Sequence, residues 1–323
     1  MNDVATRYSG HTPNKKIKEY WEGTIPWISL KDTKRLDNRY IYETEDCTTE
    51  EGIKNSSAVL LPKDTVVLSR DATVGKIGIM GCEMATSQHF INYVCGKDLN
   101  NIYLYYDFFS KKGLFERIGI GSTIKTIGLD FFKKLNIIVP PLKEQEKIAD
   151  ILSTVDGQID DTEMLIEKCQ GLKKGLMQRL LTKGIGHTEF KKTEVGEIPV
   201  DWEVKKLEDV SYITMGQSPS SDSYNDKGIG VPFFQGNSEF GNIYPTVKKW
   251  CSEPKKIAEP LDILISVRAP VGAVNINNDR ACIGRGLASI RQSNKINYMY
   301  LYYVLSISQD ILNSSAQGAH LQL

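Results

Sequence analysis

The stretch at residues 140–184 constrains the fold of this chain more than any other. Two prolines open it, a glycine closes it and no proline interrupts it, which predicts one long helix. At about 1.5 Å per residue, a helix over 143–181 would be roughly 58 Å long. One small domain cannot cover that length, which favours a spacer over the alternative of a helix packed along its own domain. Apolar residues at steps of mostly three and four form a coiled-coil-type seam along it: Ile148, Leu152, Val155, Ile159, Ile166, Cys169, Leu172, Leu176 and Leu180.

The composition indicates a globular protein of two ordinary domains. The chain has 323 residues, of which 41% are apolar and 25% charged. Its formal net charge is zero, so it lacks the overall basic signature of many nucleic-acid-binding proteins. We expect neither a membrane span nor a signal peptide, because no run of eighteen apolar residues occurs and no basic start precedes an apolar core.

The cysteines and histidines predict neither a disulfide framework nor a metal centre. None of the six cysteines forms a Cys-x-x-Cys pair, and in a chain of this length they are typical of reduced thiols in a cytoplasmic protein. The four histidines lack the spacing of metal ligands. We therefore expect no metal and no cofactor.

The region after the long stretch repeats the region before it. Gly10-His11-Thr12-Pro13 matches Gly216-Gln217-Ser218-Pro219, and residues 25–28 match 231–234, both with an offset of 206. Further landmarks follow in the same order at an offset of about 197–198, among them 64–75 with 262–272, 103–106 with 300–303, and 121–124 with 318–321. A conserved order of landmarks with a slowly drifting offset predicts an internal duplication. In this alignment Arg70 and Arg268 are counterparts.

The predicted fold class is α+β, with two similar mixed α/β domains joined by the long coiled-coil-type helix. Short β-like runs at 25–30, 65–69, 76–80, 89–94 and 135–139, and a helical run at 101–117, fill the first domain without a regular α/β alternation. We place the first domain at 1–139, the helix at 140–184, a linker or return loop at 185–201, and the second domain at 202–323. The aromatic runs 103–109 and 298–303 have helical periodicity and favour core positions over base stacking.

This pattern resembles the DNA-specificity subunit of type I restriction-modification systems. The residues involved are the two Gly-x-[Ser/Thr]-Pro motifs, Ser69-Arg70 with Gly75, Ser266 and Arg268 with Gly272, Thr86-Ser87-Gln88, 121–123, Gly318-Ala319, and the helix start Pro140-Pro141-Leu142-Lys143-Glu144-Gln145-Glu146-Lys147-Ile148-Ala149-Asp150-Ile151-Leu152. The resemblance covers essentially the whole chain, and the helix start is its most specific part. It implies two target-recognition domains, each of which reads one half of a split double-stranded DNA sequence.

The resemblance also implies partners. Helices of this family dock two methyltransferase (modification) subunits, and a restriction subunit joins that core, so the start and seam of the helix are candidate docking residues: Glu144, Gln145, Ile148, Leu152, Val155 and Ile159. Acidic residues in a first helical turn also complement the helix dipole, which explains Glu144 without a partner. The second copy stops at the point where the first copy continues into the long helix. A second long helix is therefore missing, as expected of a fragment or of a natural truncation. The seam would then need a partner, either a second copy of this chain or a methyltransferase subunit.

The chain itself is expected not to be an enzyme. It has no Gly-x-Gly-x-x-Gly motif and no Walker A motif, and Val139-Pro140-Pro141-Leu142 lacks the residues that flank Pro-Pro in amino-methyltransferase sites. An alternative function is that of a truncated scaffold, which dimerises or competes for methyltransferase subunits without supporting restriction.

Residue type selects the candidate DNA contacts. Arg and Lys bind guanine, Asn and Gln bind adenine, and Ser or Thr binds either base. The candidates are Ser29, Lys31, Ser69, Arg70, Lys76, Gln88 and His89 in the first copy, and Gln235, Asn237, Ser266, Arg268 and Arg285 in the second. Lys125 is a candidate phosphate contact. The alternative for Ser69-Arg70 and its counterpart is that they close a turn or form an ion pair within the fold.

Overall fold

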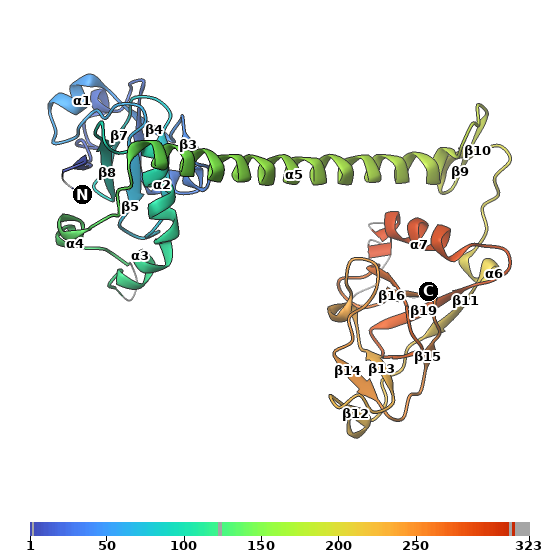
Figure 1. The fold of residues 1–323 in the computed structure, drawn as a ribbon. Helices are drawn as coiled ribbons and strands as arrows, with labels where there is room; N and C mark the ends of the chain where they lie inside the picture. Colours follow the sequence, from blue (N-terminus) through green and yellow to red (C-terminus); the bar gives the residue numbers. More distant parts are fainter. Residues whose placement is uncertain (2, 122–124, 310–311, 314–323) are drawn as a thin grey trace. The chain divides into compact units, whose positions relative to one another are not determined.

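The computed structural model describes all residues except 2, 122–124, 310–311 and 314–323. Its contacts divide the chain into two compact units, Met1–Met164 and Leu165–Leu323. We use domain 1 for the elements from β1 to α4 and domain 2 for those from β11 to α7, and we describe each by itself (Figure 1). The single long helix α5 (Leu142–Lys183) follows domain 1 and confirms the helix predicted at 143–181.

Domain 1 contains two mixed sheets and four short helices. Its strands are β1 (Ala5–Ser9), β2 (Ile25–Ile28), β3 (Tyr40–Ile41), β4 (Asp46–Thr48), β5 (Val66–Ser69), β6 (Ile77–Met80), β7 (Ala85–Thr86) and β8 (Phe90–Cys95). Its helices are α1 (Glu50–Lys54), α2 (Asn101–Ser110), α3 (Lys112–Ile118) and α4 (Leu129–Lys134). The larger sheet has the order β1-β8-β5-β6-β3 and the smaller one the order β4-β2-β7.

Domain 2 contains two corresponding sheets that differ in strand number: among the described residues, its four-stranded sheet has no counterpart of β3, and its five-stranded sheet has two more strands than the three-stranded sheet of domain 1. Its strands are β11 (Ser211–Met215), β12 (Tyr224–Asn225), β13 (Val231–Phe234), β14 (Lys249–Cys251), β15 (Ile257–Ala258), β16 (Ile263–Ser266), β17 (Val274–Ile276), β18 (Ala281–Ile283) and β19 (Leu287–Gln292). Its helices are α6 (Leu207–Val210) and α7 (Tyr298–Ile307). The sheets have the orders β11-β19-β16-β17 and β12-β14-β13-β18-β15.

Strand register confirms the internal duplication. In domain 1, β1 pairs with β8 from Ala5↔Cys95 to Ser9↔Ile91. In domain 2, β11 pairs with β19 from Ser211↔Gln292 to Met215↔Ala288, which is the same register after shifts of 206 and 197 residues. The parallel pairs β2·β7 and β13·β18 correspond by the same two shifts. The duplication therefore extends to individual main-chain pairs.

The sheets β1-β8-β5-β6-β3 and β11-β19-β16-β17 are each covered by a helix rich in aromatic and aliphatic residues. Asn100 caps α2 by accepting a bond from the Tyr103 amide, and Asn297 caps α7 in the same way at the Met299 amide. The α2 side chains Tyr103, Leu104, Tyr105 and Phe108 are buried in the domain 1 core, as are Leu301, Tyr302 and Leu305 of α7 in domain 2. Core packing, predicted from helical periodicity, is thus confirmed for these buried residues.

Three predicted segments differ in the structure. Residues 135–139 form no strand, although Leu135 packs into the core. The helical run at 101–117 is two helices, because the backbone leaves helical geometry at Lys111. The segment expected to be a linker, 185–201, contains the hairpin of β9 (Phe190–Thr193) and β10 (Gly196–Pro199). The repeat landmarks at 122–124 and 318–321 lie outside the described residues.

Candidate nucleic-acid interface

In each domain the loops that follow two parallel strands leave the same edge of the sheet that contains these strands. β2 pairs with β7, and β13 pairs with β18, both in parallel. Because parallel strands point the same way, their following loops meet at one edge. Seven of the thirteen predicted DNA contacts lie on these loops: Ser29, Lys31, Gln88 and His89 in domain 1, and Gln235, Asn237 and Arg285 in domain 2.

The Gly-x-[Ser/Thr]-Pro motif crosses the same edge in both domains. Main-chain bonds from Gly10 to Phe90 and from His11 to Thr86 hold it in domain 1, and bonds from Gly216 to Leu287 and from Gln217 to Ile283 repeat them in domain 2. A Cβ at Gly10 would overlap the Ser87 carbonyl oxygen, and one at Gly216 would overlap that of Gly284. Only glycine permits this close crossing of two backbones.

The crossing brings the motif hydroxyl to the loops. The Thr12 hydroxyl donates to Oε1 of Gln88, and the Ser218 hydroxyl lies 3.2 Å from Oε1 and 3.1 Å from Nε2 of Gln235. We define the domain 1 loop cluster as Thr12, Ser29, Lys31, Gln88 and His89. The domain 2 loop cluster is Ser218, Gln235, Asn237 and Arg285.

The domain 1 loop cluster surrounds a surface cavity of about 250 Å³. The buried Trp27 forms part of its wall, and the Trp27 indole is fixed by a 3.1 Å bond from Nε1 to the His11 carbonyl oxygen. Lys15, Lys31 and Asp46 line the cavity as well, so an apolar wall is combined with charged groups. Such a concave surface with a few fixed polar groups is typical of a recognition site.

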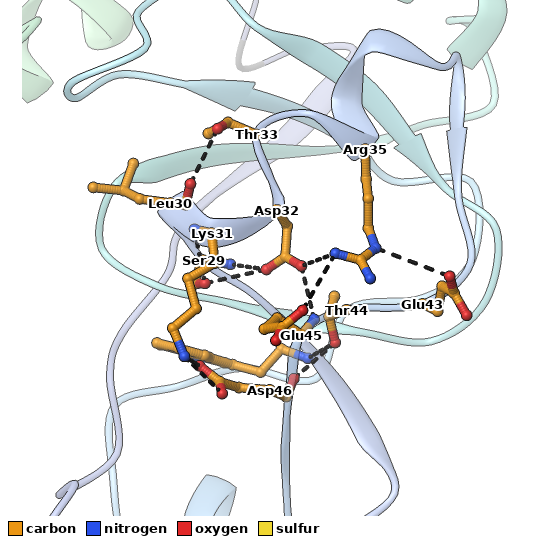
Figure 2. Close-up of polar contacts among 11 residues, drawn as sticks. Ser29, Leu30, Lys31, Asp32, Thr33, Arg35, Glu43, Thr44, Glu45 and Asp46 are labelled. Atoms are coloured by element: carbon orange, nitrogen blue, oxygen red, sulfur yellow. Dashed lines mark hydrogen bonds and ion pairs between the residues drawn. The ribbon is translucent and has the colours of Figure 1, made fainter. Parts of the chain in front are cut away.

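Asp32 organises the loop after β2, as Figure 2 shows. Its fully buried carboxylate accepts bonds from the Ser29 amide at 2.9 Å, the Ser29 hydroxyl at 3.1 Å and the Glu45 amide at 2.8 Å, and Arg35 lies 3.4 Å away. Ser29 is buried within this network and also accepts a bond from the Lys31 amide. The Ser29 hydroxyl thus has a structural role in the loop.

Lys31 extends from this loop into solvent. Its Nζ lies 2.9 Å from the Asp46 carboxylate, and that carboxylate raises the pKa of Lys31 above its ordinary value. The side chain remains 60% exposed and keeps its positive charge at neutral pH. It is therefore accessible to a phosphate or a base.

Arg70 supports the loop after β7. Its Nε donates to the Ile127 carbonyl oxygen at 3.0 Å, and one terminal nitrogen donates to the Gln88 carbonyl oxygen at 3.2 Å. The buried Asp71 carboxylate lies 3.5 Å from this guanidinium and 2.9 Å from Nδ1 of His89. Since only 15% of the Arg70 side chain is exposed, it holds the backbone that presents Gln88 and His89.

The predicted pairing of Arg70 with Arg268 is wrong by one position. The Arg70 amide bonds to the His89 carbonyl, and the equivalent bond in domain 2 runs from Val267 to Gly286. Arg70 therefore corresponds to Val267, and Arg268 corresponds to Asp71. Arg268 is exposed, so the two arginines have different environments.

Ser69 and Ser266 do correspond, and both are buried inside the fold. The Ser69 hydroxyl donates to the Asp71 carbonyl oxygen at 3.1 Å, and the Ser266 hydroxyl donates to that of Pro270 at 2.6 Å. They close equivalent turns before Gly75 and Gly272. This corrects the expectation that these two serines contact DNA, and it agrees with the turn-closing alternative.

Two further predicted residues are bonded away from the cluster. Lys76 forms an ion pair with Asp37, and Lys125 donates from an exposed position to the Glu116 carbonyl oxygen at 3.4 Å. In domain 2, Gln235 and Arg285 are exposed and Asn237 is half-buried, and the Arg285 amide donates to the Ser218 hydroxyl oxygen at 3.3 Å. Of the thirteen predicted DNA contacts, the fold thus groups four in the domain 1 loop cluster and three in the domain 2 loop cluster.

The start of α5 is anchored on domain 1. Gln145 is fully buried: its Nε2 donates to the carbonyl oxygens of Pro140 and Asp98, and its Oε1 accepts from the Asn100 amide at 2.9 Å. This corrects the expectation that Gln145 contacts a partner. The carboxylate of Asp156, about three helical turns further on, accepts a 2.6 Å bond from Tyr106, whose pKa is raised by burial and by that carboxylate.

The other candidate docking residues are accessible to different extents. Ile148 packs partly against the domain 1 core, whereas Glu144 is exposed. Leu152, Val155 and Ile159 expose 37%, 46% and 51% of their surface, which leaves an apolar stripe on α5. A stripe of this kind is available to a partner helix.

Sequence reasoning missed Thr12 and Ser218 as site residues, although both lie in the repeated motif. Their role depends on a contact across 76 residues in domain 1 and 17 in domain 2. The motif repetition was the available signal, because a hydroxyl residue occupies the same position in both copies.

The described part of the chain also bears on metal binding, membrane insertion and thiol chemistry. Among the described residues, no group of three or more His, Cys, Asp or Glu side chains is placed to hold a metal ion. None of the described helices has the length and apolarity needed to cross a membrane. Burial raises the pKa of Cys95 to about 12 and that of Cys282 to about 11, so both thiols stay protonated at neutral pH.

The model of the type I restriction modification DNA specificity domain matches residues 1–169 and 199–323. The chain is 46% identical over 216 residues to the putative type I restriction enzyme MjaX specificity subunit of Methanocaldococcus jannaschii, which covers 65% of this chain and 51% of that protein. The chain spans about half the length of the first relatives that it matches.

Solved structures share the fold over nearly the whole chain. A chain from a structure that describes complex assembly and conformational transition of the type I R-M system has a TM-score of 0.62 at 26% identity, and the match covers 98% of this chain and 80% of that one. The HsdS subunit from Thermoanaerobacter tengcongensis has a TM-score of 0.51 at 26% identity, with coverage of 97% and 79%.

Proposed function

Because this chain belongs to the type I restriction-modification DNA specificity family, we propose that it is a non-catalytic subunit that recognises a bipartite target in double-stranded DNA. Each domain reads one half of the target through its loop cluster. The observation that supports this most directly is the duplicated strand-end edge, where the same main-chain frame presents different polar side chains in the two domains. The chain would act in the cytoplasm, where the DNA is found.

The proposal includes partners that perform the chemistry. Methyltransferase subunits bind along α5, where Glu144, Leu152, Val155 and Ile159 are accessible, and a restriction subunit joins through that complex. The anchored start of α5 fixes its direction relative to domain 1 through Gln145, so a partner bound to the helix has a defined position relative to that loop cluster.

The test is the sequence of modified bases in a host genome. The chain is expressed with its methyltransferase subunits in a host that lacks them, and modified positions are mapped by sequencing. We expect one motif with two specific halves and an unspecified spacer. Modification at a single contiguous motif, or none above the background of cells without the chain, would refute the proposal. Omitting the methyltransferase subunits is the control for modification by the chain alone.

The exposed stripe on α5 favours a second candidate function, a scaffold that dimerises or competes for methyltransferase subunits. Light scattering on the full chain, with and without those subunits, separates the two. A stable dimer that excludes the subunits supports the scaffold, whereas a complex with the subunits that selects DNA supports target recognition. Leu152→Glu is the matched variant. Leu152 is partly exposed on α5, so a charge at this position should disrupt helix association and leave the domain 1 core intact.

A further inference from the structure

Both loop clusters contain one exposed glutamine that touches the hydroxyl of the Gly-x-[Ser/Thr]-Pro motif. In domain 1 this is Gln88 with Thr12, and in domain 2 it is Gln235 with Ser218. The glutamines are not counterparts, since Gln88 follows β7 whereas Gln235 follows β13. Two different loops therefore deliver the same side chain to the same hydroxyl position.

The hydroxyl contact suits one kind of ligand. The Thr12 hydroxyl uses one lone pair of the Gln88 Oε1 and leaves the second lone pair and both Nε2 protons available. An oxygen that accepts and a neighbouring nitrogen that donates match the N6 amino group and N7 of adenine in the major groove. In domain 2, the Ser218 hydroxyl is fixed in turn by the Arg285 amide, so the Gln235 amide is also held by a positioned group.

The backbone around each pair is closely packed. Gly10 and Gly216 pack directly on the crossing loop, and the prolines that follow the hydroxyl residues, Pro13 and Pro219, are buried. In domain 1 the Arg70 guanidinium also binds the Gln88 carbonyl oxygen. An exposed glutamine loses side-chain entropy when it binds, and an amide that is already oriented loses less.

We propose that these hydroxyl-held glutamines each select an A·T base pair in one half of the DNA target, with Thr12 and Ser218 as positioning residues. This inference rests on the proposed function and adds the identity of one base pair per half. It also assigns a physical role to the motif residue before the proline: the hydroxyl orients the amide and does not itself need to contact DNA.

The test is selection of DNA from a library of duplexes with a randomised central block. The full chain with its methyltransferase subunits is used, and bound DNA is sequenced. Gln88→Ala should lose the preference for A·T at one position by roughly 5- to 100-fold, and the other positions should keep theirs. Gln235→Ala should do the same in the other half. Gln178→Ala, at an exposed glutamine on α5, is the matched control and should change no position.

The positioning role has its own variants. Thr12→Val removes the hydroxyl at nearly constant volume and should weaken the same A·T preference by roughly 2- to 10-fold, while affinity for poly(dI-dC) stays unchanged. Thr12→Ser restores the hydroxyl and should restore the preference. The double variant Thr12→Val with Gln88→Ala should select no worse than Gln88→Ala alone, because the hydroxyl acts through the amide.

The outcomes separate this inference from the proposed function. If the wild-type complex selects a motif and Gln88→Ala and Gln235→Ala select the same one, the glutamine inference is wrong and target recognition stands. If the glutamine variants change a position that is not A·T, the base assignment is wrong. If the wild-type complex selects no motif at all, both proposals are refuted.

Discussion

The two domains share a main-chain frame and differ in the side chains it presents. The β1·β8 and β11·β19 registers are identical after constant shifts, and the turns closed by Ser69 and Ser266 are equivalent. In contrast, the position of Gln88 in domain 1 is occupied by Arg285 in domain 2, and that of His89 by Gly286. A duplicated frame with unlike loop residues is what a protein needs to read two different half-sites with one architecture.

The largest expected difference lies directly before β16, an interior strand of its sheet. Asp262 is buried and binds Arg291 at 2.8 and 2.9 Å, the Ser289 hydroxyl at 2.7 Å and the Glu259 amide at 2.8 Å. Asp262→Ala leaves these groups without a partner and should lower the free energy of unfolding of domain 2 by about 3–4 kcal/mol. Hydrogen exchange followed by mass spectrometry measures each domain separately.

The equivalent position in domain 1 supplies the control. Thr65 is buried there and donates one 2.7 Å bond to the Pro62 carbonyl oxygen, so Thr65→Ala should cost domain 1 only about 1 kcal/mol. Equal losses in the two domains would contradict the view that only domain 2 depends on a buried, ion-paired carboxylate at this position.

A second comparison concerns the carboxylates that cap the loops after β2 and β13. Asp32→Ala removes the acceptor of the Ser29 and Glu45 amides and should destabilise domain 1 by about 2–3 kcal/mol. Glu239 is only half-buried and accepts one main-chain bond, from the Gly236 amide at 3.2 Å, so Glu239→Ala should cost domain 2 about 0.5–1 kcal/mol. Denaturant titration with domain-resolved exchange checks the ratio, and a larger effect at Glu239 would contradict the view that Asp32 is the more strongly bonded of the two carboxylates.

Local patterns predicted the frame, and long-range contacts decided the site. The apolar seam between two opening prolines and a closing glycine predicted α5, and the repeated motifs predicted the duplication, because both signals are periodic and local. The arginine alignment failed because it matched two aspartates, Asp64 and Asp262. The structure instead aligns Asp64 with Leu261, and both residues have a φ near +70° (69° and 71°). Burial of Gln145 was not predictable from its helical position, because it depends on the Asn100 amide and the Asp98 carbonyl group, 45 and 47 residues away.

The corrected alignment of the arginines leads to a third prediction, of intermediate size. Arg268 is exposed, and Arg268→Ala should lose about 1–2 kcal/mol of discrimination at one base pair in the second half of the target. Arg70→Ala should instead weaken the A·T preference at the position read by Gln88 in the first half, since Arg70 holds the backbone of Gln88. Selection from randomised duplexes distinguishes the two patterns, and an Arg268→Ala effect that is uniform across sequences would assign that residue to phosphate contact.

The smallest expected effect concerns Lys31, whose counterpart loop in domain 2 carries the uncharged Asn237. Lys31 is exposed and its pKa is raised by Asp46, so it stays charged and its replacement should not change the unfolding transition measurably. If Lys31 binds a phosphate, Lys31→Gln should reduce the slope of log K against log salt by about 1. Lys34→Gln, at an exposed lysine nearby, is the matched control and should leave the slope unchanged. An unchanged slope for both variants would mean that Lys31 is bound to Asp46 and not to DNA. The loop after the first parallel strand would then present only neutral side chains to DNA in domain 1, as it does in the proposal for domain 2.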